Sequence, residues 1–251
     1  MRCFLAASLI AVAGAAAAID VDLELVLAVD VSGSMDREEQ EVQRDGYVDA
    51  LRSDEVWAAV QRGAHQRIAV VYLEWSGEGE TRVPVDWTLI DSREALLDFA
   101  GELAEAPLGT IRGTSISGAL DTAVEMLATN GFEGWRRVID ISGDGPNNRG
   151  RPVLDARDDA LATGVTINGL PLMIRPTAMA GSLDDYYADC VIGGPGAFSI
   201  PVYNRADMRA AIKRKMILEI AGLSPPPTVM RAQAGTTDCG ASERRRFWTP
   251  P

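Results

Sequence analysis

The sequence predicts an α/β fold, with a doubly wound, mainly parallel sheet, helices on both faces and one antiparallel edge strand. Apolar runs of strand length alternate along the chain with longer amphipathic stretches, which is typical of such a sheet. Over 251 residues, 47% are hydrophobic and 24% charged, the balance of a soluble protein with a substantial core. The short link Gly77-Glu78-Gly79 favours a hairpin, so the strands on either side of it should be antiparallel.

The predicted strands are apolar runs bounded by polar residues, glycine or proline. They are residues 23–29, 67–75, 81–87, 137–142, 165–173 and 198–202. The first is apolar throughout except for Glu24, as expected of a strand that is buried on both faces. The second and third flank the hairpin link and should form one edge of the sheet.

The predicted helices follow the strands and carry apolar residues at helical spacing. They are residues 36–51, 53–60, 91–105, a helix from near residue 114, then 152–163, 182–192 and 205–220. Ser53 can cap the second of these helices. Leu96, Phe99 and Leu103 share one face of the third, which predicts that this face packs on the sheet.

Three segments are expected along the chain: a signal peptide (1–18), a single α/β domain (19–222) and a Pro-rich linker with a polar tail (223–251). Arg2 precedes an apolar stretch that ends in alanines, which indicates a secretory signal cleaved near Ala18. The stretch is short for a membrane span of about 20 residues, although an uncleaved anchor is the alternative. We therefore expect a secreted or periplasmic protein with no membrane span after cleavage.

Net charge and cysteine content limit the partners and the environment. The formal charge of −12 argues against nucleic acid as a partner. Removing the signal leaves Cys190 and Cys239 in an oxidising compartment, which predicts a disulfide that ties the tail to the domain. Two free thiols are the alternative, because spacing alone does not show that the sulfurs meet.

An oxygen-rich motif, Asp30-x-Ser32-x-Ser34, directly follows the first predicted strand. In open α/β sheets, ligands bind at the carboxyl ends of the strands, and oxygen ligands suit a hard divalent cation. Thr114 lies on a loop that opens a helix, and Asp144 follows another buried strand. A doubly wound topology would bring the loops after the first and fourth strands together, so that all five side chains surround one ion.

This order of residues resembles the metal-ion-dependent adhesion site (MIDAS) of von Willebrand factor type A domains, and the resemblance covers roughly residues 23–221. Residues 184–198 also resemble an uncharacterised group of secreted bacterial type A-like proteins, a match that assigns no activity. One departure is visible, since Gly143 stands where a Thr or Ser commonly precedes the aspartate.

The resemblance implies that Ser32, Ser34 and Thr114 bind the metal directly, while Asp30 and Asp144 act partly through water. It implies Mg²⁺, with Mn²⁺ or Ca²⁺ as alternatives, and one open position for an acidic residue of a protein partner. The expected function is metal-dependent, adhesion-type protein binding without catalysis.

Two other functions stay open: a metal-assisted hydrolase using Asp144, and a metal-free structural or assembly scaffold. His65 is the only histidine, and neither a Gly-x-Ser-x-Gly motif nor a phosphate-binding loop is present, so the sequence does not favour an enzyme. Asp140 interrupts an apolar strand. We expect it to accept hydrogen bonds from loop backbone or from an arginine, and not to be a sixth metal ligand.

Overall fold

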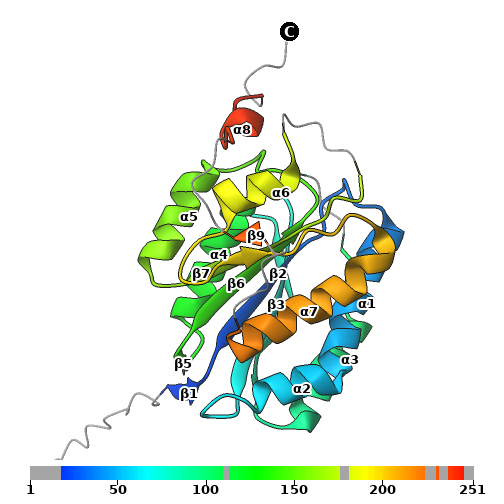
Figure 1. Cartoon of the computed structure of the whole chain (residues 1–251), viewed down its shortest axis with the longest axis vertical. Coiled ribbons are helices and arrows are strands. Elements are labelled where there is room, and N and C mark those ends of the chain that lie inside the picture. The colour runs from blue at the N-terminus through cyan, green and yellow to red at the C-terminus, as the bar shows by residue number, and fades with distance from the viewer. Residues whose placement is uncertain (1–17, 110–112, 176–180, 224–229, 232–236, 246–251) are drawn as a thin grey trace, which may run out of the picture.

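The computed structural model describes residues 18–109, 113–175, 181–223, 230–231 and 237–245 (Figure 1). The expected signal peptide, apart from Ala18, lies outside these residues. No helix within the described ranges is long and apolar enough to span a bilayer.

The centre of the molecule is a seven-stranded sheet in the order β4-β3-β2-β6-β7-β8-β9. Its strands are β2 (Glu24–Asp30), β3 (Ile68–Trp75), β4 (Thr81–Ile90), β6 (Arg137–Gly143), β7 (Thr166–Pro171), β8 (Phe198–Ser199) and β9 (Met230–Arg231). The five strands from β3 to β8 are parallel, and β4 runs antiparallel to β3 at one edge. The predicted fold class and hairpin are therefore confirmed.

The opposite edge was not predicted. β9 pairs antiparallel with β8, so the sheet has a second antiparallel edge strand contributed by residues predicted to be linker and tail. A further small sheet pairs β1 (Ile19–Val21) with β5 (Phe132–Gly134). These elements have only two or three residues each, too few to give a period-2 pattern in the sequence.

Helices cover both faces of the sheet (Figure 1). One face carries α1 (Arg37–Arg52), α2 (Asp54–Val60), α3 (Arg93–Glu105) and α7 (Met208–Ala221). The other carries α4 (Ile116–Ala128), α5 (Val153–Ala162) and α6 (Leu183–Tyr186), which continues as the π-helix η1 (Tyr187–Val191). Alternate residues of β2 serve the two cores: Leu25 and Leu27 pack on the first side, and Val26 and Ala28 on the second.

Helix starts follow the capping residues in the sequence. Ser53 caps α2 by accepting a hydrogen bond from the N–H of Val56, as predicted. Asp36 and Glu39 form a capping box at the start of α1, directly after the loop that follows β2. A 3₁₀ turn, η2 (Arg205–Asp207), precedes α7, so the predicted 205–220 helix is divided in two.

β2 lies between β3 and β6, and this order creates the switch point that the sequence predicted. The chain leaves β2 toward α1 on one face and leaves β6 toward α5 on the other. The loops after β2 and β6 therefore meet at the carboxyl end of the sheet.

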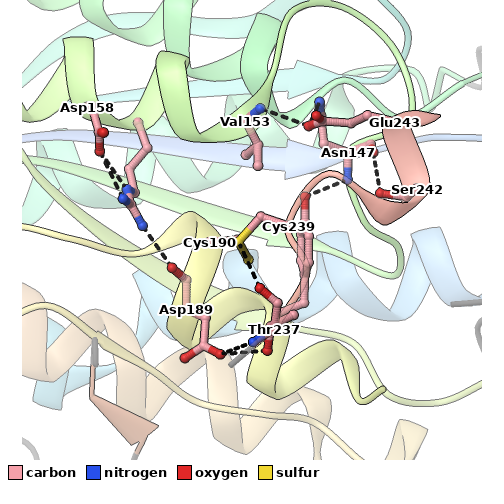
Figure 2. Close-up of a disulfide and its surroundings, with 11 residues drawn as sticks. Asn147, Val153, Asp158, Asp189, Cys190, Thr237, Cys239, Ser242 and Glu243 are labelled. Carbon is pink, nitrogen blue, oxygen red and sulfur yellow. Dashed lines mark hydrogen bonds and ion pairs between the residues drawn. A yellow bond between two sulfur atoms is a disulfide. The ribbon is translucent and has the colours of Figure 1, made fainter. Parts of the chain in front are cut away.

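The described part of the C-terminal tail packs on the domain. A disulfide joins Cys190 of η1 to Cys239, with their Cα atoms 5.6 Å apart, as the sequence predicted (Figure 2). Two residues beyond it begins the short helix α8 (Ala241–Arg245), which lies at the end of the molecule where β2 ends (Figure 1). Residues 237–245, which we call the tail segment, were predicted only as polar tail.

Asp140 lies in a buried ionic cluster between the sheet and α7. Its carboxylate pairs with the ammonium group of Lys215, which also lies 2.5 Å from a carboxylate oxygen of Glu219. The amide group of Asn168 donates a second hydrogen bond to Glu219, at 2.9 Å. The predicted partner of Asp140 was therefore wrong, because a lysine on a distant helix occupies the place expected for loop backbone or an arginine.

Candidate metal centre

The loop after β2 folds its oxygen side chains toward one another. Asp30, the last residue of β2, is fully buried, and its Oδ1 accepts a hydrogen bond of 2.7 Å from the N–H of Ser32. The hydroxyl oxygens of Ser32 and Ser34 lie 2.9 Å apart. The chain turns at Gly33 and Ser34, where the N–H of Met35 donates to the carbonyl oxygen of Ser32 at 3.1 Å, and this turn brings the three oxygen-bearing side chains together.

Asp144 belongs to the loop that follows β6, and it contacts the first loop directly. The hydroxyl of Ser34 donates a hydrogen bond to Asp144 Oδ1, with the oxygens 2.7 Å apart across 110 positions of sequence. Asp30, Ser32, Ser34 and Asp144 therefore form a continuous chain of hydrogen-bonded groups.

Backbone hydrogen bonds hold Thr114 against the loop that follows β6. Its carbonyl oxygen accepts hydrogen bonds from the N–H groups of Asn148 (2.9 Å) and Arg149 (3.1 Å). Its own N–H donates to Asn148 Oδ1 at 3.2 Å. A β-carbon at Gly145 would lie 4.0 Å from the Thr114 hydroxyl oxygen, so this hydroxyl faces the loop that carries Asp144. The structure brings all five predicted residues to one end of the sheet.

Burial and nearby negative charge raise the pKa of both carboxyl groups. The pKa of Asp30 is raised to about 7, chiefly by burial and then by the charge of Asp144, against the opposing hydrogen bonds from Ser32. The pKa of Asp144 is also raised by burial, and its hydrogen bond from Ser34 acts in the opposite direction. A cation between these groups would relieve both effects.

The residues fit a divalent cation of the hard type. Asp30 Oδ2 is buried and has no hydrogen-bond partner among the described residues, which leaves an oxygen available for a metal or its water. No three His, Cys, Asp or Glu side chains among the described residues are placed to hold a metal ion together, so the proposed ligand set includes the three hydroxyls. Hydroxyl and carboxylate oxygens are suited to Mg²⁺.

Gly143, the departure from the usual type A pattern, has a steric reason. A β-carbon at this position would lie 2.8 Å from the hydroxyl oxygen of Tyr187 and 3.0 Å from Asp30 Oδ2. Tyr187 is the first residue of η1, and its buried hydroxyl has no hydrogen-bond partner in the described structure. Tyr187 was not predicted as a site residue, although the glycine at position 143 was the signal that another group fills this space.

Two arginines, also missed, lie at the rim of the site. Arg175 donates a hydrogen bond of 3.0 Å to the carbonyl oxygen of Ser34 and pairs with Asp36 and Glu39. Arg205 pairs with Glu38 and Glu39. These cations offset the acidic first turn of α1, which stands beside Asp144.

The only histidine lies at the opposite end of the sheet, before β3. The backbone N–H of His65 donates to the carboxylate of Asp22, and its ring meets the ring of Trp135 with centroids 4.8 Å apart. The imidazole is therefore not placed to act at the candidate metal centre.

Comparison with solved structures places this fold among von Willebrand factor type A domains. Proximal thread matrix protein 1 from the mussel byssus has a TM-score of 0.58 at 15% identity, over 82% of this chain and 49% of that chain. The pilus adhesin SpaC of Lactobacillus rhamnosus GG has a TM-score of 0.61 at 14% identity, over 80% of this chain and 30% of that chain. The chain thus spans about half or less of these two proteins.

A third structure matches over nearly its full length. The vWF domain of the type V pili tip protein Mfa5 from Porphyromonas gingivalis has a TM-score of 0.57 at 12% identity, covering 84% of this chain and 99% of that domain. Another structure of the mussel protein is described as having a zinc-occupied MIDAS motif, at 13% identity and a TM-score of 0.60. At these identities the likeness shows the fold.

Sequence comparison gives the family. No curated protein matches the chain. A family model described as "Protein of unknown function (DUF1194)" matches residues 20–224, which is most of the chain. The protein is therefore a member of the DUF1194 family, and its fold is that of a von Willebrand factor type A domain.

Proposed function

We propose that this protein is a metal-dependent protein-binding domain of the adhesion type. A divalent cation held by Asp30, Ser32, Ser34, Thr114 and Asp144 accepts an acidic side chain of a partner protein. The observation that carries the proposal is the hydrogen bond from Ser34 to Asp144, which joins the two loops beside Asp30 Oδ2, a buried oxygen that no described residue bonds.

The chemistry of the donor set supports binding. Ser32, Ser34 and Thr114 offer neutral oxygens, and only Asp30 and Asp144 carry negative charge. An ion with few anionic ligands keeps positive charge with which to attract a carboxylate. Mg²⁺ is the proposed ion, with Mn²⁺ or Ca²⁺ as alternatives.

The structural neighbours support the same class of function. They include a pilus adhesin, a pilus tip protein and a mussel protein with a zinc-occupied MIDAS motif. Binding to proteins outside the cytoplasm agrees with the expected signal peptide, and we propose a secreted or periplasmic location.

We further propose that the protein is not an enzyme. A metal-assisted hydrolase needs a general base beside the metal-bound water. The carboxyl groups with raised pKa at this site are Asp30 and Asp144, and both would be engaged by the proposed cation. His65 lies at the other end of the sheet.

Calorimetry on the secreted protein, titrated with Mg²⁺ or Mn²⁺, tests the proposal. We expect binding that Asp30→Ala abolishes, with Asp158→Ala as a control at an exposed carboxylate on α5. No binding at millimolar metal would contradict the proposal and favour a metal-free scaffold. If metal binds, capture of envelope proteins that is lost with chelator supports adhesion. Hydrolysis of a phosphate ester or peptide that is lost in Asp30→Ala would instead indicate an enzyme.

A further inference from the structure

Asn147 is a completely buried residue in the β6–α5 loop (residues 144–152). Residues of the domain bond several of its polar groups. Its N–H donates to the hydroxyl of Tyr186 at 3.2 Å. Its side-chain oxygen accepts from the N–H of Ser117, on the first turn of α4, at 3.1 Å. Its amide nitrogen donates to the carbonyl oxygen of Arg151 at 3.1 Å.

The remaining groups of Asn147 are bonded by the tail segment (Figure 2). The hydroxyl of Ser242 donates to the carbonyl oxygen of Asn147 at 2.8 Å. Oε1 of Glu243 accepts from the Asn147 side-chain nitrogen at 2.9 Å and from the N–H of Val153 at 2.8 Å. Pro152, the residue before α5, makes no side-chain cap, so Glu243 supplies the cap and favourable negative charge at this helix start.

Independent contacts hold the tail segment in this position (Figure 2). Cys239 is bonded to Cys190, and the N–H and hydroxyl of Thr237 both donate to the carboxylate of Asp189, at 3.2 Å and 2.5 Å. Cys239 and Thr237 thus contact η1, whereas Ser242 and Glu243 contact the β6–α5 loop and the start of α5. The tail segment thus connects two elements that border the candidate metal centre.

The β6–α5 loop also carries one residue of the candidate metal centre and holds another in place. Asp144 stands at its start, and Asn148 and Arg149, directly after Asn147, hold the backbone of Thr114. A shift of Asn147 would therefore move both Asp144 and Thr114 relative to Ser32 and Ser34. Mg²⁺ demands near-ideal ligand geometry, so its affinity is sensitive to small shifts of this kind.

We propose that Glu243 is a positioning residue of the metal centre. Through Asn147 and the start of α5, Glu243 fixes the β6–α5 loop and so sets the affinity for the cation. The C-terminal tail is by this account a part of the metal site. The inference rests on the proposed function, because it requires that the site binds metal.

The test compares three variants of the full secreted chain. Glu243→Ala removes the acceptor for two N–H groups, and we expect Mn²⁺ and Mg²⁺ to bind about 10–100-fold more weakly, as for other residues that support metal ligands. Glu243→Gln keeps an Oε1 acceptor in the same place and should retain the wild-type affinity. Arg244→Ala is the matched control, because Arg244 is exposed on the same helix and pairs only with exposed Asp238 in the described contacts. Wild-type affinity in Glu243→Ala would overturn the inference.

A second readout needs no metal. In the presence of chelator, the amide hydrogens of Asn148 and Arg149 should exchange faster in Glu243→Ala than in the wild type, and Glu243→Gln should restore their protection. Unchanged exchange in Glu243→Ala would overturn the inference even if the protein binds metal. Absence of metal binding in the wild type would instead overturn the proposed function, so the two failures are distinguishable.

Ser242→Ala provides a milder variant should Glu243→Ala fail to fold. It removes the donor to the Asn147 carbonyl oxygen while leaving Glu243 in place. We expect a several-fold loss of metal affinity, of the order of 10-fold or less, with the Cys190–Cys239 bond intact by mass spectrometry. Wild-type affinity in this variant would again overturn the inference.

Discussion

The hydroxyl of Tyr187 occupies the space that a side chain at Gly143 would need. A β-carbon at Gly143 would lie 2.8 Å from that hydroxyl oxygen and 3.0 Å from Asp30 Oδ2. The type A pattern commonly has a Thr or Ser at this position, whereas here the hydroxyl in this space comes from a different element. Tyr187 enters from η1, and the pKa of its hydroxyl is raised by burial and by the nearby charge of Asp30.

Tyr187→Phe should weaken metal binding without destabilising the metal-free protein. The buried hydroxyl has no partner in the described residues, so its removal should leave the free energy of unfolding unchanged or raise it by up to about 1 kcal/mol. Metal affinity should fall several-fold, of the order of 10-fold, because Asp30 loses its neighbouring hydroxyl. Calorimetry and urea denaturation measure the two effects, with Tyr203→Phe, an exposed tyrosine, as control. Unaltered metal affinity would show that the hydroxyl plays no part.

Gly143→Ala should destabilise the protein, and the effect should depend on Tyr187. The new methyl group would overlap the tyrosine hydroxyl, and overpacking of this kind costs about 1–3 kcal/mol. In a Tyr187→Phe background the overlap with the hydroxyl is absent, so the cost should be smaller. A double-mutant cycle by urea denaturation gives the coupling energy. Additive effects would mean that the two positions do not share this space.

Lys215→Met should destabilise the protein far more than Lys213→Met. Lys215 is fully buried between Asp140 and Glu219, and its removal leaves two carboxyl groups without their cation, at a cost of about 3–5 kcal/mol. Lys213, on the same helix, forms a surface ion pair with Glu55, and such pairs contribute less than about 1 kcal/mol. Chemical denaturation of both variants checks the prediction. Equal effects would contradict a stabilising role for the buried cluster.

Stability should depend on pH through Glu219. Burial, and next the charge of Asp140, raise its pKa from 4.5 to about 8, against the effect of Lys215. The folded protein therefore holds a proton that the unfolded chain loses. The resulting contribution of Glu219 to the free energy of unfolding is fully present below about pH 4.5 and is lost as the pH rises toward about 8. One pKa unit corresponds to about 1.4 kcal/mol.

Glu219→Gln isolates this effect. In the wild type, the amide group of Asn168 donates a hydrogen bond to Glu219. The glutamine cannot ionise but keeps an oxygen that can accept this bond. The free energy of unfolding of the variant, measured relative to the wild type, should increase between pH 5 and pH 8. A constant difference across this range would contradict the raised pKa.

Much of the fold was predictable because its signals are local. The apolar run of β2 and the Gly77-Glu78-Gly79 link depend on neighbours a few positions apart, and so does the cap at Ser53. These features determine strands, turns and helix starts. The order of strands and helices then restricts the topology, since crossover connections in a parallel sheet have one hand.

The candidate site was predictable in part for the same reason. Asp30, Ser32 and Ser34 are grouped by alternation along one segment, and topology alone brings the ends of β2 and β6 together. Short elements such as β9 and α8 were not foreseen, because two to five residues carry too little periodicity to be recognised.

The sequence by itself determined the doubly wound sheet and the five oxygen-bearing residues at its carboxyl end. Only the tertiary structure decided that Lys215 pairs with Asp140, that Tyr187 fills the space beside Gly143, and that Glu243 bonds Asn147. Each of these contacts joins residues tens of positions apart on separate elements. Their meeting depends on how helices and tail pack on the sheet, and no local pattern encodes that packing.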